Sequence, residues 1–162
     1  MGWFSKPKPK VYTGKTLSTE EAKGLLGPWG WAAQFGKVNY AEVNSSQVVA
    51  LAQATRDALW GSGITKWATT ATCTLYASRM ASIGQERFFN ESFQDFISKG
   101  VLGLAVGELW FHPDSSPMGG PDHAINVCLT EKGALYIDPQ LPDAVRVMSQ
   151  NELNQVRSIR FL

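Results

Sequence analysis

The sequence predicts an α+β fold in which an N-terminal helical lobe packs against an antiparallel β-sheet. Before Gly100 apolar residues recur at three and four positions, which is typical of helices, and after it they form short runs, which is typical of strands. Helices and strands that are segregated along a chain indicate an α+β domain. At 162 residues, 44% of them hydrophobic, the chain can bury one substantial core. We expect a single domain over residues 17–162, preceded by an extended arm over residues 1–16.

Composition argues against several classes of partner. The formal net charge of +1 provides no electrostatic basis for binding nucleic acid or an anionic membrane. No apolar stretch approaches the roughly 20 residues that cross a bilayer, and MGWFSKPKPK lacks the apolar core of a secretory signal. Two cysteines do not make a disulfide framework. We therefore expect free thiols, no secretion signal, and a cytoplasmic or virion location.

The arm and the first helix are marked by proline and by a capping pattern. Alternating lysine and proline in KPKPK favours an extended conformation, and such an arm is suited to docking on a protein partner. Ser18 followed by Glu21 has the spacing of a capping box and predicts a helix over residues 19–26, which Gly27 and Pro28 end. The following WGWAAQF has no clear periodicity and predicts no element.

Three further helices are expected before Gly100, and a short one before the last strand. One ends at Trp60 and is predicted from apolar spacing at Val48, Leu51, Ala52, Thr55 and Leu59. The stretch TLYASRMAS fits one helical face and places Cys73 at or near a helix N-terminus. NESFQDFISKG predicts an amphipathic helix capped by Asn90, whose inward residues are Phe93, Phe96 and Ile97. Ser149 and Glu152 repeat the capping-box spacing and predict the short helix.

Strands are predicted over residues 101–111, 123–130, 134–138 and 157–162. The second and third are joined by the turn TEKG, so they should form an antiparallel hairpin whose outer ends lie together. His123 begins one strand and Asp138 ends the other, which predicts that these two side chains are neighbours.

This pairing has a chemical use beside Cys73. A thiol attacks a carbonyl carbon efficiently only as a thiolate, and a helix N-terminus or a neighbouring imidazolium lowers its pKa. The imidazole must itself be oriented by an acceptor such as aspartate. Cys73, His123 and Asp138 therefore form a candidate catalytic set, provided that the helix carrying Cys73 faces the hairpin.

With an upstream cysteine, HAINVCLTEKGALYIDPQ resembles the histidine and aspartate strands of the papain-like and transglutaminase-like cysteine hydrolase superfamily. It is most similar to the papain-fold deamidase toxins and to the cysteine-protease domain of a fungal agglutinin, over roughly residues 70–141. The resemblance implies a papain-like fold in which Cys73 is the nucleophile, His123 the general base and Asp138 the orienting acid. It also implies a protein or peptide substrate and no cofactor.

The oxyanion site departs from this pattern. Papain-like peptidases carry a glutamine shortly before the nucleophile, and GITKWATTATC has none. The Cys73 backbone N–H would then act with another donor, either the Trp67 indole or the Thr70 hydroxyl. Gln140 is a further candidate for oxyanion or substrate binding.

Other residues and another class of function remain open. Cys128 lies inside an apolar strand and is interpreted as a core residue, and His112 as a loop histidine without a role. Histidine and carboxylates without regular ligand spacing give no basis for a metal site. The enzyme interpretation covers a peptidase, a deamidase or a transglutaminase acting on an amide. The alternative is a non-catalytic structural or binding protein of this fold, such as a phage-particle assembly component that docks through its arm.

Overall fold

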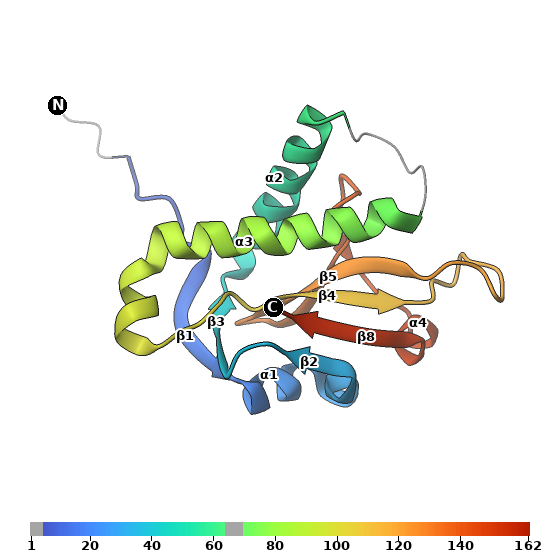
Figure 1. Cartoon of the computed structure of the whole chain (residues 1–162), viewed down its shortest axis with the longest axis horizontal. Helices are drawn as coiled ribbons and strands as arrows, with labels where there is room; N and C mark the ends of the chain where they lie inside the picture. Colours follow the sequence, from blue (N-terminus) through green and yellow to red (C-terminus); the bar gives the residue numbers. More distant parts are fainter. Residues whose placement is uncertain (1–4, 64–69) are drawn as a thin grey trace.

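The computed structural model describes residues 5–63 and 70–162, which form helices around one curled, mixed β-sheet (Figure 1). In chain order the elements of these residues are β1 (Tyr12–Ser18), α1 (Thr19–Leu26), the 3-10 helix η1 (Gly27–Ala32), β2 (Ala33–Phe35), β3 (Asn39–Val43), the 3-10 helix η2 (Ser45–Gln47), α2 (Val48–Gly61), α3 (Thr70–Lys99), β4 (Val106–Phe111), β5 (His123–Thr130), β6 (Gly133–Ile137), β7 (Val145–Arg146), α4 (Gln150–Asn154) and β8 (Val156–Phe161).

The sheet corrects the expectation of a purely antiparallel arrangement. Its strands lie in the order β1-β3-β5-β4-β8-β2, and β6 pairs with β5 and β7. The β4–β5, β4–β8 and β5–β6 pairs are antiparallel as predicted, but β2 pairs with β8 and β3 with β5 in parallel. The N-terminal half thus contributes three strands to the sheet. These strands are too short or too irregular to produce a period-two pattern that the sequence could reveal.

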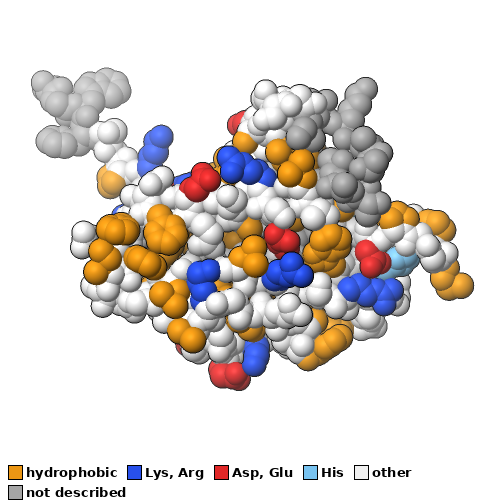
Figure 2. Space-filling view, in the orientation of Figure 1, with side chains coloured by type: hydrophobic (Ala, Val, Ile, Leu, Met, Phe, Trp, Pro, Cys, Tyr) orange, Lys and Arg blue, Asp and Glu red, His pale blue; other side chains and the backbone are white. Residues whose placement is uncertain are grey.

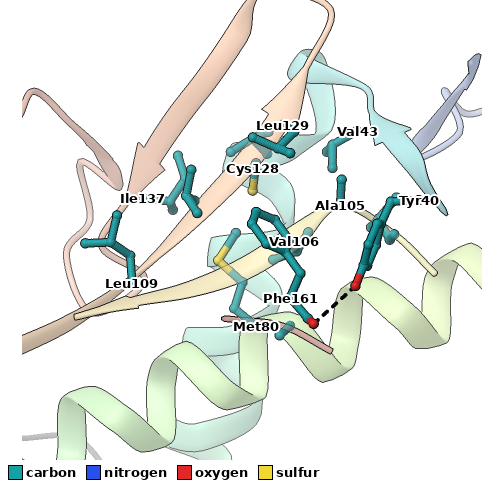
Figure 3. Packing of buried hydrophobic residues seen from close by; sticks show 14 of the residues in the cluster. Tyr40, Val43, Met80, Ala105, Val106, Leu109, Cys128, Leu129, Ile137 and Phe161 are labelled. Atoms are coloured by element: carbon teal, nitrogen blue, oxygen red, sulfur yellow. Dashed lines mark hydrogen bonds between the residues drawn. The ribbon is translucent and has the colours of Figure 1, made fainter. Parts of the chain in front are cut away.

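The main core lies between α3 and the central strands. In Figure 1, α2 and α3 lie above the sheet and α1 below it. Figure 3 shows Met80 of α3 among side chains of β4, β5 and β8, including Val106, Cys128 and Phe161. Cys128 has no exposed surface, so its interpretation as a core residue is confirmed. This packing fixes the distance and the orientation of α3 relative to β4 and β5.

The two predicted capping boxes are confirmed. In the first, the Glu21 backbone N–H donates to Ser18 Oγ at 3.1 Å and the Ser18 N–H donates to the Glu21 carboxylate at 2.8 Å, so α1 begins at Thr19. The second, between Ser149 and Glu152, starts α4. Local hydrogen bonds decide these helix starts, which is why a four-residue pattern was sufficient to find them.

The C-terminal part of α3 agrees in part with the prediction. α3 consists of two helical segments joined by a kink at Ser92, two residues after the helix start expected at Asn90. Phe93 and Ile97, expected to face inward, are 52% and 60% exposed. Phe93 and Phe89 instead pack on Phe96, with ring centroids 6.1 and 5.0 Å apart. Amphipathic spacing identified the apolar face but not whether another element covers it.

Among the described residues no helix is long and apolar enough to cross a membrane.

The boundary of the N-terminal arm lies earlier than expected. Residues 5–10 are exposed, but Val11 and Tyr12 are buried and β1 pairs with β3. The Val11 N–H donates to the Glu91 carboxylate at 2.7 Å, and the Tyr12 ring packs edge-on against Phe88. The arm predicted over residues 1–16 therefore ends at Lys10, because the apolar side chains that follow it belong to the core.

This boundary can be tested with two truncated proteins. We expect removal of residues 1–13 to lower the free energy of unfolding by on the order of 3 kcal/mol relative to removal of residues 1–9, because only the longer deletion removes the buried side chains of Val11 and Tyr12. Urea unfolding of both proteins measures the difference. Equal stability of the two would show that β1 is not part of the folding unit.

Candidate active site

Cys73 lies in the first turn of α3, which begins at Thr70. Its side chain is 3% exposed and packs with Ala77 of the same helix, Ala124 of β5 and the partly buried Trp110 of β4. A thiol at a helix N-terminus is close to the positive end of the helix dipole, which stabilises a thiolate. The packing of α3 on the sheet thus holds the thiol against the start of β5.

His123 and Asp138 come together at the open end of the β5–β6 hairpin. The strands pair with Asn126 opposite Ile137 and turn through the two residues between Thr130 and Gly133. His123 Nε2 and Asp138 Oδ2 are 2.8 Å apart, and the two residues are 8% and 1% exposed. The predicted contact between these side chains is present, and it is shielded from water.

The His123 side chain also hydrogen-bonds the Cys73 thiol. Because Asp138 occupies Nε2, Nδ1 is the ring nitrogen that remains for the sulfur. The Phe111 ring packs edge-on against the imidazole, with centroids 5.8 Å apart, and restricts its plane. The structure therefore brings Cys73, His123 and Asp138 into one hydrogen-bonded chain.

The electrostatics of this chain favour a charged thiol and imidazole. Burial raises the pKa of Cys73, but the hydrogen bond with His123, the Ala124 backbone N–H and the imidazolium charge outweigh it, so the net pKa lies below its ordinary value. Burial lowers the pKa of His123, but its hydrogen bonds with Asp138 and Cys73 raise it to about 9. The contact between Cys73 and His123 therefore shifts both groups toward their charged forms, thiolate and imidazolium.

The turn that carries Asp138 is held by its own backbone and by α2. The Gln140 N–H donates to Asp138 Oδ1 at 3.1 Å, and the Asp138 N–H donates to the Ala144 carbonyl at 2.8 Å. Arg56 of α2, 3% exposed, donates to the Leu141 carbonyl and to Gln53 Oε1, the latter at 2.5 Å. Asp138 is thus positioned by contacts on both sides of its carboxylate.

Asn126 couples the helix of the thiol to the strand of the histidine. It is fully buried on β5, and its Nδ2 donates to the Ala77 carbonyl of α3 at 2.9 Å and to the Gly107 carbonyl of β4 at 3.2 Å. Sequence reasoning assigned no role to Asn126, Arg56 or Trp110. A polar residue inside the apolar run HAINVCLT was a signal for Asn126, whereas the contacts of Arg56 and Trp110 depend on distant segments and left none.

Of the three residues expected at an oxyanion or substrate site, the structure describes the side chain of Gln140 alone. Trp67 lies outside the described residues, and the structure describes Thr70 only as the first residue of α3. Gln140 follows Asp138 by two residues, and its buried side-chain oxygen and nitrogen have no hydrogen-bond partner among residues 5–63 and 70–162. A buried amide without partners retains its hydrogen-bonding capacity.

The remaining candidate residues lie apart from the hydrogen-bonded chain. Burial raises the pKa of Cys128 to about 12, so this thiol stays protonated. His112 Nδ1 is 3.3 Å from Asp122 Oδ1 and lines a separate surface groove. Within residues 5–63 and 70–162 no three histidine, cysteine or acidic side chains are grouped so that they could hold a metal ion.

Comparison with known proteins supports the fold. Nine chains of solved structures match it. One, described as "PSL1a-E64 complex", superposes with a TM-score of 0.59 and 19% sequence identity, covering 90% of this chain and 51% of the other. The protein thus spans about half the length of that relative, and identity at this level establishes similarity of fold alone. No protein-family model and no curated protein matches the sequence.

The charge state of the site predicts selective alkylation. At about pH 6 we expect iodoacetamide to modify Cys73 rapidly and Cys128 negligibly, because only Cys73 has a lowered pKa. The His123→Ala variant should lose the low-pH reactivity, since the imidazolium that stabilises the thiolate is removed. Mass spectrometry of the two cysteine peptides measures both rates. Reactivity at Cys73 that begins only above about pH 8 would contradict the ion pair.

The support of the Asp138 turn predicts a positioning role for Arg56. Replacing Arg56 with methionine leaves the Leu141 carbonyl without its donor and should cost about 1–3 kcal/mol of stability. It should also lower the pKa of His123 below about 9, because Asp138 is held less firmly. Arg79→Met, which removes a partly exposed ion pair, is the matched control and should leave that pKa unchanged. NMR titration of His123 measures the difference.

Proposed function

We propose that this protein is a papain-like, cysteine-dependent acyl-transfer enzyme that cleaves an amide in a protein or peptide. The observation that carries the proposal is the hydrogen-bonded chain from the Cys73 thiol through His123 to Asp138. Thiol, base and orienting acid meet at a helix N-terminus, which is the arrangement that nucleophilic cysteine catalysis requires. The fold match adds support, since the matched protein is named as a complex with E64, an inhibitor of cysteine proteases.

The geometry suggests how acyl transfer would proceed. The Cys73 thiolate attacks the amide carbonyl carbon, a C–S bond forms, and the carbonyl electrons move onto oxygen. The Cys73 backbone N–H is our candidate donor to this oxyanion, together with a second donor for which Gln140 is the candidate. As the intermediate collapses the C–N bond breaks, and the His123 imidazolium protonates the departing nitrogen.

The second half of the reaction uses the same residues. His123, now neutral, accepts a proton from a water molecule that attacks the thioester carbon. The C–S bond breaks, the product leaves as a carboxylic acid, and the thiolate and imidazolium are restored. Asp138 accepts a hydrogen bond from the Nε2–H group throughout, which directs Nδ1 toward sulfur and substrate. The residues present supply this chemistry without a cofactor.

A non-catalytic role has one observation in its favour. Phe89, Phe93 and Ile97 are exposed at the C-terminal end of α3, where they form an apolar cluster with the half-buried Phe96. The exposed lysine- and proline-rich arm leads into the neighbouring β1. Clusters of this kind mark protein contacts more often than isolated apolar residues do. The second candidate function is therefore a binding or assembly protein of this fold, such as a component of a phage particle.

Turnover distinguishes the two functions. We expect the full chain, incubated with unfolded casein and with glutamine-containing peptides, to release either new amino termini, as a peptidase, or ammonia, as a deamidase. Cys73→Ser should abolish both products, because the hydroxyl is not ionised by His123. A protein that is folded and alkylated at Cys73 yet gives neither product would favour the binding role.

The orienting role of Asp138 gives a separate prediction. Asp138→Asn preserves the shape of the side chain. It replaces the oxygen that accepts a hydrogen bond from Nε2–H by an amide NH₂ that can donate, so the imidazole would carry its proton on Nδ1 instead of Nε2. We expect turnover to fall by about two to four orders of magnitude with little change in KM. Steady-state kinetics measure this, and Asp143→Asn at an exposed position is the matched control. A proportional rise in KM at unchanged kcat would argue against an orienting role.

A further inference from the structure

A surface groove of about 570 Å³ begins at Asp122, the residue before His123, and has no role in the mechanism above. It is formed by the loop between β4 and β5, by α4 and by the start of β8, and its polar lining includes His112, Asp114, Asp122, Asn151 and Arg157. Figure 2 shows acidic, basic and histidine side chains gathered at the end of the molecule where this loop projects. A groove of this size accommodates more than one amino-acid residue.

The register of the sheet places this groove next to the thiol. Trp110 pairs with Ala124 and Phe111 with His123 across β4 and β5, and the next pair in this order is His112 and Asp122, whose side chains are in contact at 3.3 Å. Side chains two residues apart lie on the same face of a strand, about 7 Å from one another. Cys73 packs on Trp110 and Ala124. The His112–Asp122 pair therefore lies just beyond the end of the β4–β5 ladder, at the end where Trp110 and Ala124 contact Cys73.

The position of His123 indicates which half of a substrate the groove would hold. In acyl transfer the imidazolium protonates the departing nitrogen, so the leaving group lies on the histidine side of the sulfur. Asp122, a lining residue, directly precedes His123 in the chain. A leaving group held near His123 would therefore lie toward the end of β5 at which the groove begins.

The groove keeps unpartnered donors beside its two carboxylates, Asp114 and Asp122. Asp114 is satisfied, because its two oxygens accept from Ser149 and Asn151 at 2.6 Å each. Asp122 has one oxygen at His112 and the other 3.8 Å from Arg157 Nε. Among the described residues the terminal nitrogens of Arg157 and Nε2 of His112 have no partner. The Arg157 side chain is 57% exposed, so its planar fork of N–H donors is available to a ligand.

We propose that this groove binds the leaving-group half of the substrate and selects a carboxylate there, through Arg157 and His112. The inference rests on the proposed function and deepens it, because it names the substrate class. The substrate is a peptide amide whose leaving amine carries an acidic side chain or a terminal carboxylate. The reaction is then peptide-bond cleavage, since the ammonia released by a deamidase would leave the groove empty.

The test is protection of Cys73 from alkylation by three peptides that differ in one charge. The full chain is treated with iodoacetamide at about pH 6 in the presence of acetyl-Ala-Ala-Glu-Ala-amide or of the same peptide with Gln or Lys in place of Glu. We expect the glutamate peptide to protect Cys73 at a concentration about threefold or more lower than the other two. Added salt should reduce this preference, because the Arg157 contact is exposed to solvent.

Two arginine variants locate the effect. Arg157→Gln should abolish the preference for glutamate. Arg160→Gln removes the same charge from an exposed position of the same strand outside the groove, and should keep the preference. Equal protection by the three peptides, or a preference for glutamate that survives Arg157→Gln, overturns the carboxylate site. The proposed function is unaffected by either result if Cys73 is still alkylated rapidly.

A separate measurement detects failure of the proposed function: without any peptide, Cys73 would react slowly with iodoacetamide. NMR then tests the groove without the thiol. We expect the side-chain amide signals of Asn151 and Gln155 to shift with the glutamate peptide and not with the lysine peptide, because both residues line the groove. Identical spectra with the two peptides overturn the proposal.

Discussion

The rest of the candidate site depends on the buried hydrogen bond between His123 and Asp138. Asn126 pairs with Ile137, so the next position, 138, lies opposite Ile125. Position 138 is therefore diagonally across from His123, on the same face of the hairpin. A slip of one residue would move Asp138 to the opposite face and leave a carboxylate buried without its partner. Such a buried charge is strongly destabilising, so the pair selects the register as well as orienting the imidazole. Structure and proposed chemistry thus require the same contact.

The thiol is brought to this pair by packing at some distance from it. Met80 and Phe88 of α3 are fully buried, and Asn126 ties the Ala77 carbonyl of α3 to the sheet one turn after Cys73. The helix therefore approaches β5 closely enough for the Ala124 N–H and the imidazole to stabilise a thiolate. The two cysteines differ for the same reason: Cys128 is enclosed by apolar side chains alone, while Cys73 faces hydrogen-bond donors at the edge of the core.

One end of the molecule concentrates polar chemistry and the other concentrates exposed apolar surface. The N-terminus of α3, the start of β5, α4 and the β4–β5 loop lie together at one end in Figure 1. The far end of α3 carries the apolar cluster of Phe89, Phe93, Phe96 and Ile97. The two surfaces lie at opposite ends of α3, so a partner docked on the apolar cluster would not cover the groove.

The sequence by itself determined the features that depend on neighbouring residues. Capping boxes set the starts of α1 and α4, an apolar run and a short turn set the β5–β6 hairpin, and the ends of that hairpin predicted the His123–Asp138 contact. The tertiary structure decided what depends on distant segments. Parallel pairing of β2 with β8, burial of Val11, the clamp of Arg56 on Leu141 and the side-by-side placement of Cys73 and His123 join residues tens of positions apart. Local hydrogen bonds and periodicity are encoded in short windows, whereas these contacts form only when the whole core has packed.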